Sequence, residues 1–319
     1  MRIVNLIENT EGGSGCEFAH GLSFYIETEK HRVLLDLGPS EKTLLNAEKL
    51  GIDLSSVDTV ILSHGHYDHS GGMIPFAEIN KKAVIYMQQT ATDDHYGYDE
   101  EAEEGKRYRY IGIDKRIKDL PQVRFLKGDY VIDDELELLT IKKRNRPLPF
   151  TNGRLFVKLK DEYVRDEFSH EHFLVIHDKG RDILMSGCAH NGIPNILDAY
   201  REKYGKAPDV VISGFHLMKK SEYSDEELRE IIKTARELDK YDTRFITCHC
   251  TGIPAYRVMK NIMGEKLGYV HSGDEIPVDA LGDIKKKEGR SSFMKWHKFF
   301  AWATVFCFCL TMITGYEKK

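Results

Sequence analysis

Short apolar runs alternate with amphipathic segments along most of the chain. The first runs are rich in β-branched and aromatic residues, are separated by turns that contain glycine, and lie at 2–7, 22–28 and 32–38. This pattern predicts strands at the start of a sheet. The segment 40–52 has apolar residues at helical spacing between Ser40, which we expect to cap the helix, and Gly51, which ends it. A further strand is predicted at 57–63.

The second half of the chain continues with strands and helices in turn. Short strands and then a hairpin are predicted at 122–140, 154–160 and 172–187. The hairpin turns at Lys179 and Gly180. After it come a helix, a strand, a helix and a strand, at 195–205, 208–214, 224–241 and 244–250. Ser224 and Glu227 have the spacing of a capping box. The alternation indicates an α/β fold.

One segment between these regular elements has no sustained period. From 92 to 115 the sequence is first acidic and then basic and aromatic. We predict an inserted loop or flap there, and the alternative is a solvated charged excursion without a function of its own.

The composition is that of an ordinary globular protein. Of the 319 residues, 41% are hydrophobic and 30% are charged, so the disordered and collagen-like classes are excluded. The length fits one large α/β unit or two smaller domains. A net charge of -5, spread along the chain, provides no broad basic face. Nucleic acid is therefore not predicted as a partner.

Cysteine usage indicates a reducing environment. The six cysteines are Cys16, Cys188, Cys248, Cys250, Cys307 and Cys309. The first residues, MRIVNLIENT, become polar too soon for the apolar core of a secretory signal. We therefore predict free thiols and a cytoplasmic location.

The stretch SHGHYDHSGG, residues 63–72, carries the clearest chemical signal. It follows a predicted strand, and the glycine between His64 and His66 lets the backbone turn so that both imidazoles can point at one ion. Asp68 and His69, on the far side of the turn, can reach a second ion. Nitrogen and oxygen ligands suit zinc, manganese or iron rather than calcium. The alternative is a surface loop that happens to be rich in histidine.

HGHYDH has the form HxHxDH and resembles the signature of the metallo-β-lactamase superfamily. The upstream LLDLG is similar to the strand and DxG element that usually precedes it. GLSFYIETEKHRVLLDLGPS, SGCAHNGI, SGFHL and HCTG, scattered over residues 1–275, resemble the subgroup labelled dihydropterin-ribosyl-aminobenzene-phosphate synthase-like, from the methanopterin pathway. The resemblance implies a four-layer αββα sandwich of the α/β (α+β) class, with a metal site at one edge between the two sheets.

The resemblance also assigns ligands residue by residue. His64 and His66 match the first-metal pair, and Asp68 and His69 match the second-metal pair. His249, at the end of a late predicted strand, matches the family's final histidine. Alternation along that strand would set the two neighbouring cysteines on the face opposite to His249, which argues against a Cys-His-Cys chelate.

Two further ligands of the family have no direct match. Where many members have a bridging aspartate, SGCAH has Cys188. We assign His190, two residues later, as a ligand and Cys188 as a further candidate for contact with metal or substrate. For the family's third histidine, which lies upstream of that position, EFSHEHFLV supplies Glu171, His170 and His172 as candidates.

Two more histidines are candidates for the site. His216 follows a predicted strand end, where α/β folds often place functional side chains, and it could donate a proton or bind a substrate anion. The alternative is a histidine that is hydrogen-bonded beneath the following helix. His20, just before the second strand, is a candidate for contact with metal or substrate. The other histidines are interpreted as surface or loop residues: His31, His95, His177, His271 and His297.

The resemblance implies a metal-dependent hydrolase. Two divalent ions, of which zinc fits best, would lower the pKa of a shared water, and the hydroxide would attack an ester, phosphoester or related bond of a small anionic substrate. Asp68 is expected to orient the hydroxide, and His216 or the second ion to hold the developing oxyanion. The alternative is a pterin-related synthase that uses the ions to bind phosphate and stabilise an anion. An iron redox protein, which typically has Glu in place of His66, and a non-catalytic binding module are further alternatives.

The end of the chain differs in composition. Residues 299–316 contain no charged side chain and follow a basic segment. A helix of that length spans about 27 Å, the lower limit for crossing a bilayer. We predict a catalytic domain over 1–283, a basic linker over 284–298 and a hydrophobic helix over 299–316 that tethers a cytoplasmic domain to the inner face of a membrane. A buried or dimer-forming helix and an altered reading frame are the alternatives, and the oligomeric state is left open.

Overall fold

Two seven-stranded sheets form the centre of the structure, which is a computed structural model that describes residues 1–277. The first sheet contains, in spatial order, β18 (Glu275–Ile276), β1 (Arg2–Ile7), β2 (Ser23–Glu27), β3 (Arg32–Leu35), β4 (Thr59–Ile61), β5 (Val84–Gln88) and β8 (Val123–Leu126). The second contains β17 (Leu267–Tyr269), β16 (Arg244–Thr247), β15 (Val210–Ser213), β14 (Arg181–Ser186), β13 (His172–Asp178), β10 (Leu136–Thr140) and β9 (Tyr130–Val131).

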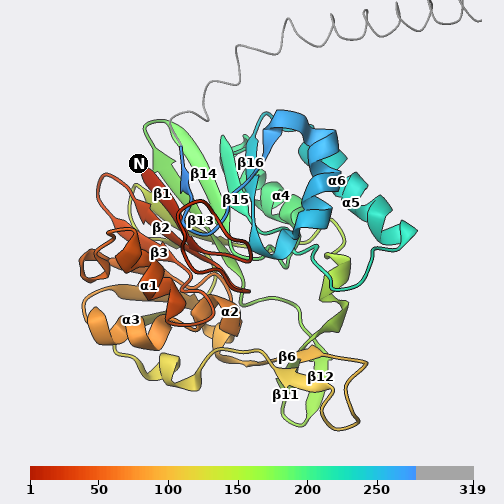
Figure 1. The fold of residues 1–319 in the computed structure, drawn as a ribbon, viewed down its shortest axis with the longest axis horizontal. Coiled ribbons are helices and arrows are strands. Elements are labelled where there is room, and N and C mark those ends of the chain that lie inside the picture. The colour runs from red at the N-terminus through yellow and green to blue at the C-terminus, as the bar shows by residue number, and fades with distance from the viewer. Residues whose placement is uncertain (278–319) are drawn as a thin grey trace, which may run out of the picture. The chain divides into compact units, whose positions relative to one another are not determined.

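Helices cover the outer face of each sheet (Figure 1). The helices on the first sheet are α1 (Lys42–Lys49) and α3 (Met73–Ile79). Those on the second are α4 (Ile193–Tyr204), α5 (Asp225–Leu238) and α6 (Ile253–Met263). The short helix α2 (Tyr67–Ser70) lies within residues 63–72, which we call the histidine loop, and carries Asp68 and His69. The layers follow the order helix, sheet, sheet, helix, so the αββα sandwich implied by the resemblance is confirmed.

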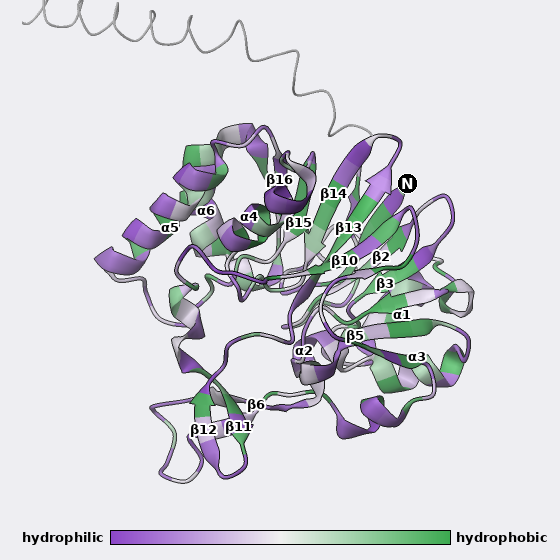
Figure 2. Cartoon of the chain, turned by 180° about the vertical axis from the view of Figure 1, so that it is seen from behind, coloured by the Kyte–Doolittle hydropathy of each residue, from purple (hydrophilic) through white to green (hydrophobic). Residues whose placement is uncertain are grey.

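The central strands are buried on both faces. In the first sheet, Val4 and Leu34 pack with Ala47 of α1 and Phe76 of α3. Ile3, which points to the opposite side of β1, is buried as well. A strand covered on both faces reads as a continuous apolar run, which is why the pattern of the sequence located these strands. Figure 2 shows hydrophobic residues along them, whereas hydrophobic and hydrophilic residues alternate along the helices.

The predicted helix signals are mostly confirmed. Ser224 Oγ accepts a hydrogen bond from Glu227 N at 3.2 Å and Ser224 N donates to Glu227 Oε2 at 2.7 Å, which is the expected capping box of α5. Gly51 follows α1 with a φ of 69°. The N-cap of α1 is assigned to Glu41, one residue after the predicted Ser40, but Ser40 Oγ still accepts a hydrogen bond from Lys42 N in the first turn at 3.4 Å.

A third, four-stranded sheet corrects the expectation for residues 92–115. We call it the lid sheet; it contains β12 (Glu162–Arg165), β11 (Leu155–Leu159), β6 (Asp94–Tyr98) and β7 (Tyr108–Tyr110). Residues predicted as a loop or flap thus form two strands. Their partner β11 lies far along the chain, and Gly97 of β6 pairs with Leu155. The pairing is non-local, so no local period in the sequence revealed it. Figure 1 shows the lid sheet projecting below the main sheets.

Part of the expected organisation lies outside the described residues. The predicted linker at 284–298, the predicted tail helix at 299–316, His297 and the last two cysteines all belong to that part. Among residues 1–277, none of the helices combines the length and the apolar character needed to cross a bilayer.

Candidate metal centre

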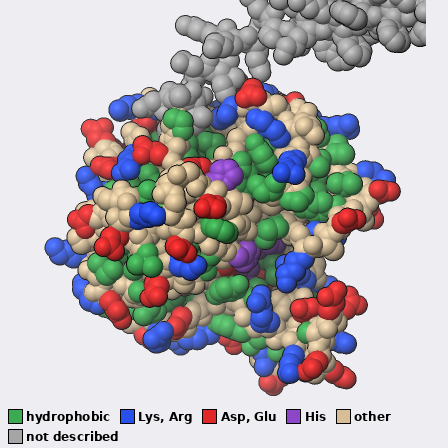
Figure 3. Space-filling model, in the orientation of Figure 1, with side chains coloured by type: hydrophobic (Ala, Val, Ile, Leu, Met, Phe, Trp, Pro, Cys, Tyr) green, Lys and Arg blue, Asp and Glu red, His purple; other side chains and the backbone are tan. Residues whose placement is uncertain are grey.

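The candidate ligands gather at one edge of the two main sheets. Each follows the end of a strand: His64, His66, Asp68 and His69 come after β4, Cys188 and His190 after β14, His216 after β15 and His249 after β16. β14, β15 and β16 run parallel, so their carboxyl ends meet at the same edge. In Figure 3, histidine side chains reach the surface at two places near the centre of the face shown.

Strained backbone marks this edge. Asp36, Ala189, His216 and His249 have φ angles of 62°, 52°, 49° and 47°. This left-handed conformation is uncommon for residues other than glycine and persists where the surroundings hold it. All four residues lie shortly after the end of a strand: Asp36 after β3, Ala189 after β14, His216 after β15 and His249 after β16.

His64, His66 and His190 form a first cluster. Their ligand atoms lie within 4.8 Å of one another, and all three side chains are buried. None of the three Nε2 atoms has a hydrogen-bond partner within residues 1–277. Burial, together with the neighbouring imidazoles, holds the pKa of each ring well below its ordinary value, so the rings are neutral.

Neighbouring side chains set the orientation of these rings. Ser63 Oγ donates to Asp36 and therefore accepts from His64 Nδ1 at 2.8 Å. Asn152 Oδ1 accepts from His190 Nδ1 at 3.0 Å. In a neutral imidazole the other nitrogen then carries a lone pair. Among residues 1–277, the Nε2 lone pairs of His64 and His190 are thus left without a partner, within 4.8 Å of His66, and a buried acceptor without a partner is costly unless something binds it. A divalent metal ion fits this arrangement.

Asp68, His69 and His249 form a second cluster beside the first. His69 Nε2 and His249 Nε2 are 3.2 Å apart, and Asp68 Oδ2 lies 3.8 Å from the first and 3.5 Å from the second. Asp36 Oδ2 binds His69 Nδ1 at 2.6 Å, and Asn9 Oδ1 accepts from His249 Nδ1 at 2.7 Å. This cluster combines a carboxylate with two oriented imidazoles.

The charges of the second cluster compensate one another. Burial opposes protonation of His69, but the carboxylates of Asp36 and Asp68 outweigh it and raise the pKa of His69 to about 9. Burial likewise opposes ionisation of Asp68, yet His69, His249 and His20 hold the pKa of Asp68 well below its usual range. A metal ion that binds here takes the place of a proton.

Cys188 lies between the two clusters. Its Sγ is 3.2 Å from His69 Nε2, and it groups with His64 and His69 within 4.8 Å. The expectation for the late cysteines is partly wrong: Cys250 groups with Cys188 and His249 rather than facing away. Strand β16 ends at Thr247, and the chain from His249 is a 3-10 turn, so strand alternation no longer applies. Among residues 1–277 the four cysteines are free, as predicted.

The other predicted site residues lie around the clusters. His216 is half-buried, with its ring centroid 4.1 Å from that of His190, and its Nδ1 has no hydrogen-bond partner within the described chain. His20 is half-exposed, and its Nε2 lies 3.3 Å from Asp68 Oδ2. Burial, more than the nearby His249, lowers the pKa of His20 to about 4.

The candidates from EFSHEHFLV belong to neither of the two clusters. Glu171 accepts hydrogen bonds from the backbone of His190 at 2.6 Å and of Asn191 at 2.8 Å, so it supports the loop that carries His190. His172 Nδ1 contacts Gln88 at 3.2 Å inside the core. His170 contacts the histidine loop, because its Nδ1 accepts a hydrogen bond from Gly65 N at 2.9 Å.

The comparison with known proteins identifies the family. The metallo-beta-lactamase superfamily model matches residues 17–227. The chain belongs to this superfamily. The uncharacterized protein MJ0448 of Methanocaldococcus jannaschii is 30% identical over 259 residues, which is 79% of this chain and 91% of the relative. A 7,8-dihydropterin-6-methyl-4-(beta-D-ribofuranosyl)-aminobenzene-5'-phosphate synthase of the same organism is 31% identical over 299 residues, 86% of this chain and 95% of the relative.

A solved structure agrees with this assignment. The crystal structure of Tm1679, a metal-dependent hydrolase of the beta-lactamase superfamily, superimposes with a TM-score of 0.71 at 30% identity, and the match covers 86% of this chain and 98% of that one. The resemblance to the superfamily and to the dihydropterin synthase subgroup is therefore confirmed.

Several supporting residues of this metallo-β-lactamase site were not predicted. Asn9 and Asn152 orient ring nitrogens, and Glu8, which is fully buried, accepts from His249 N at 2.9 Å. These residues come from separate segments, and no local motif connects them to the histidines. Asp36 could have been predicted, because it is the aspartate of LLDLG, which resembles the DxG element that precedes the histidine motif. His95, interpreted as a surface or loop residue, is in fact buried, since β6 turns it toward His66.

Proposed function

We propose that this protein is a dinuclear metal-dependent hydrolase that acts on an ester, phosphoester or related bond of a small anionic substrate. The observation that carries the proposal is the convergence of three buried Nε2 atoms, from His64, His66 and His190, that have no hydrogen-bond partner in the described part of the chain, beside a second cluster around Asp68. Such lone pairs without partners are expected at a metal site rather than in a packed core.

The two clusters would hold one ion each. His64, His66 and His190 form the first ligand set, and Asp68, His69 and His249 the second, with Cys188 between them. Imidazoles, one carboxylate and one thiol suit zinc, with manganese or iron as the other candidates. Bound divalent ions supply a Lewis acid and lower the pKa of water near them.

The protein's own side chains would complete the reaction. The carboxylate of Asp68 is ionised and points between His69 and His249, so it can accept a hydrogen bond from an attacking water and orient it. His216 has a buried Nδ1 free to bind the developing oxyanion or to protonate the leaving group. The half-exposed His20 lies beside Asp68, where it would be able to contact a substrate bound at the second cluster.

The test has two steps. Metal analysis of the purified protein should find two equivalents of divalent metal, mainly zinc. The metal-loaded protein is then screened against phosphodiesters, phosphomonoesters, lactones and thioesters, with His66→Ala as the inactive control. Turnover of one class that depends on metal and on His66 is the expected result. Full activity after removal of the metal, or in His66→Ala, would reject the proposal.

A second candidate is a pterin-related synthase, favoured by the 31% identity to the dihydropterin synthase over 86% of the chain. In that case the ions would bind a phosphate group and stabilise an anion. Incubation with a dihydropterin pyrophosphate together with a ribofuranosyl-aminobenzene phosphate separates the two. A condensed product formed with release of pyrophosphate supports the synthase, whereas hydrolysis of simple esters supports the hydrolase.

A membrane tether stays a prediction. It would place the catalytic domain at the inner face of a membrane, and it is tested by fractionation of the full-length chain against a chain that ends at residue 283. Full-length protein that stays in the soluble fraction without detergent would contradict it.

A further inference from the structure

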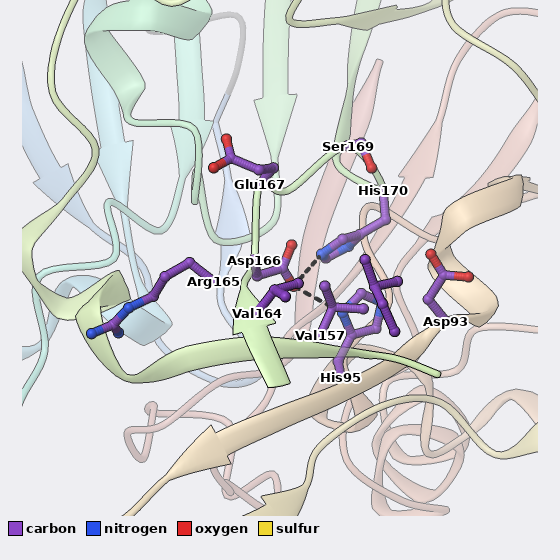
Figure 4. A pocket seen from close by; sticks show the side chains of 10 residues that line it. Asp93, His95, Val157, Val164, Arg165, Asp166, Glu167, Ser169 and His170 are labelled. Carbon is purple, nitrogen blue, oxygen red and sulfur yellow. Dashed lines mark hydrogen bonds and ion pairs between the residues drawn. The ribbon is translucent and has the colours of Figure 1, made fainter. Parts of the chain in front are cut away.

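A buried cluster outside the two ligand sets connects the lid sheet to the histidine loop. His95 lies in β6, Asp166 directly follows β12 and His170 precedes β13; their exposed fractions are 1%, 6% and 1%. They line a cavity of about 190 Å³ between the lid sheet and the segment around residue 170. Figure 4 shows both imidazoles directed at the carboxylate of Asp166.

The hydrogen bonds in this cluster have a definite direction. Gly65 N donates to His170 Nδ1 at 2.9 Å, so that nitrogen is an acceptor. In a neutral imidazole the proton is then on Nε2, which donates to Asp166 Oδ2 at 3.2 Å. His95 Nδ1 binds the same oxygen at 2.8 Å, and Asp166 Oδ1 accepts from Phe168 N at 2.7 Å. Both oxygens of Asp166 are therefore engaged.

The charge state of the cluster agrees with this direction. Burial, and next the charge of His95, lower the pKa of His170, which keeps its ring neutral. Burial opposes ionisation of Asp166, but His170 and His95 hold the pKa of Asp166 below its usual range. An ionised carboxylate is the stronger acceptor for an imidazole N–H.

The same geometry argues against a third metal site. His66, His95, Asp166 and His170 have ligand atoms within 4.8 Å of one another. However, His170 Nδ1 already accepts from Gly65, so Nε2 could bind a metal only as an imidazolate or after loss of that bond. The cluster is better described as a chain of hydrogen bonds that starts in the lid sheet and ends at Gly65.

Gly65 is a sensitive end point for this chain. It lies between His64 and His66, and a Cβ built on it would be 2.5 Å from Ala91 O, so its backbone is packed directly on the residues that lead into β6. A shift of the Gly65 amide would therefore change the directions of the two neighbouring imidazoles.

We propose that Asp166 is a positioning residue for the histidine loop and acts through His170 on Gly65. His95 of the lid sheet holds Asp166 in place, so the position of the loop depends on the position of the lid sheet. The proposal rests on metal binding at His64 and His66, which is part of the proposed function, but it does not depend on which reaction the protein catalyses. Supporting residues behind metal ligands commonly change metal affinity by about 10–100-fold.

The test measures cobalt(II) binding by absorption, independently of any substrate. Asp166→Asn should weaken binding at the first cluster about 10–100-fold, and His95→Phe about tenfold. Tyr98→Phe is the matched control, because Tyr98 lies on the same strand but its ring contacts Tyr108 and Phe156 on the outer face of the lid sheet. This control should bind cobalt as the wild type does. Unchanged affinity in Asp166→Asn would overturn the proposal.

A double-mutant cycle separates the chain from a general loss of stability. In His170→Asn the amide oxygen can replace Nδ1 as the acceptor for Gly65 N, while the link to Asp166 is cut. Asp166→Asn should then cause no further loss of cobalt affinity in the His170→Asn background. Additive losses would show that Asp166 acts independently of His170, and would overturn the proposal.

A further test uses the wild-type sequence, so its result cannot arise from a substitution that impairs folding. Nitrogen-15 NMR of the histidine rings in metal-stripped protein should show His170 as the Nε2–H tautomer. The Nδ1–H tautomer would overturn the proposal. Binding of a third cobalt ion that is lost in Asp166→Asn would overturn it as well, because the cluster would then be a metal site.

Discussion

The two ligand clusters differ in how they satisfy their own polar atoms. In the first, three neutral imidazoles direct unpaired Nε2 atoms at one another. In the second, a proton on His69 is balanced by the carboxylates of Asp36 and Asp68. The second cluster can therefore compensate its charges without a metal ion. In the first cluster, the described residues supply no donor to the three Nε2 atoms. We therefore predict that loss of its metal ion destabilises the first cluster more than loss of the other ion destabilises the second cluster.

The largest effect is expected for His66→Ala, which removes a ligand of the first cluster. Activity should fall below about 1% of wild type, because even supporting residues of metal sites cost 10–100-fold. Circular dichroism should show that the fold survives. His177→Ala, at a half-buried histidine of β13 outside the site, is the control and should keep its activity. Retained activity in His66→Ala would show that the first cluster does not hold an ion that the reaction needs.

Asp68→Ala should abolish activity in a different way. The first cluster keeps all three imidazoles, so mass spectrometry of the native protein should find one bound ion instead of two. Equal loss of both ions would show that the clusters are not separable, and retention of two ions would show that Asp68 does not hold the second.

A smaller effect, about 10–100-fold in the affinity for one ion, is expected when a supporting amide is removed. Asn152→Ala should weaken the ion held by His190, and Asn9→Ala the ion held by His249. Sequential titration with cobalt(II) measures the two affinities separately. The reverse assignment, or the same effect on both ions, would contradict the division into two clusters.

The smallest effect is expected for the stability contributed by His31, which lies outside the site and serves as a comparison. Both of its ring nitrogens contact carboxylates. They lie 2.8 Å from Asp58 and 2.9 Å from Asp133. Burial opposes protonation, but the hydrogen bonds to Asp133 and Asp58 raise the pKa of His31. A raised folded-state pKa stabilises the protein fully below about pH 6.5, and this contribution is lost as the pH rises through the folded value.

His31→Gln tests this sign. Urea unfolding of both proteins between about pH 5 and pH 9 should show a difference below about 1 kcal/mol, because the pair is partly exposed, and the difference should be largest at acid pH. A difference that grows toward alkaline pH would show that His31 is neutral in the folded protein, like the histidines of the first cluster.

The histidine loop could be predicted because its information is local. His64, His66, Asp68 and His69 lie within one turn after an apolar strand, and the spacing alone predicts two groups of ligands. The strands themselves were predictable for a similar reason, since burial on both faces leaves continuous apolar runs such as 2–7.

The composition of the clusters required the fold. His190 completes the first set because β14 ends at the same edge as β4, and Cys250 turns toward Cys188 because β16 ends before it. Neither fact follows from strand alternation in the sequence. His95 was misjudged for the same reason: the pairing of β6 with β11 decides which face of β6 is buried.

The sequence by itself determined that this protein has a loop of potential metal ligands in a sheet-and-helix fold, because residue spacing and apolar runs act over short distances. The tertiary structure brought the distant His190 and His249, which the resemblance had assigned, next to that loop, and it added supporting residues such as Asn9. Only the tertiary structure showed that the lid sheet packs against His66 through His95. The physical reason is that orientation, burial and charge compensation depend on neighbours that meet only when the strands have assembled.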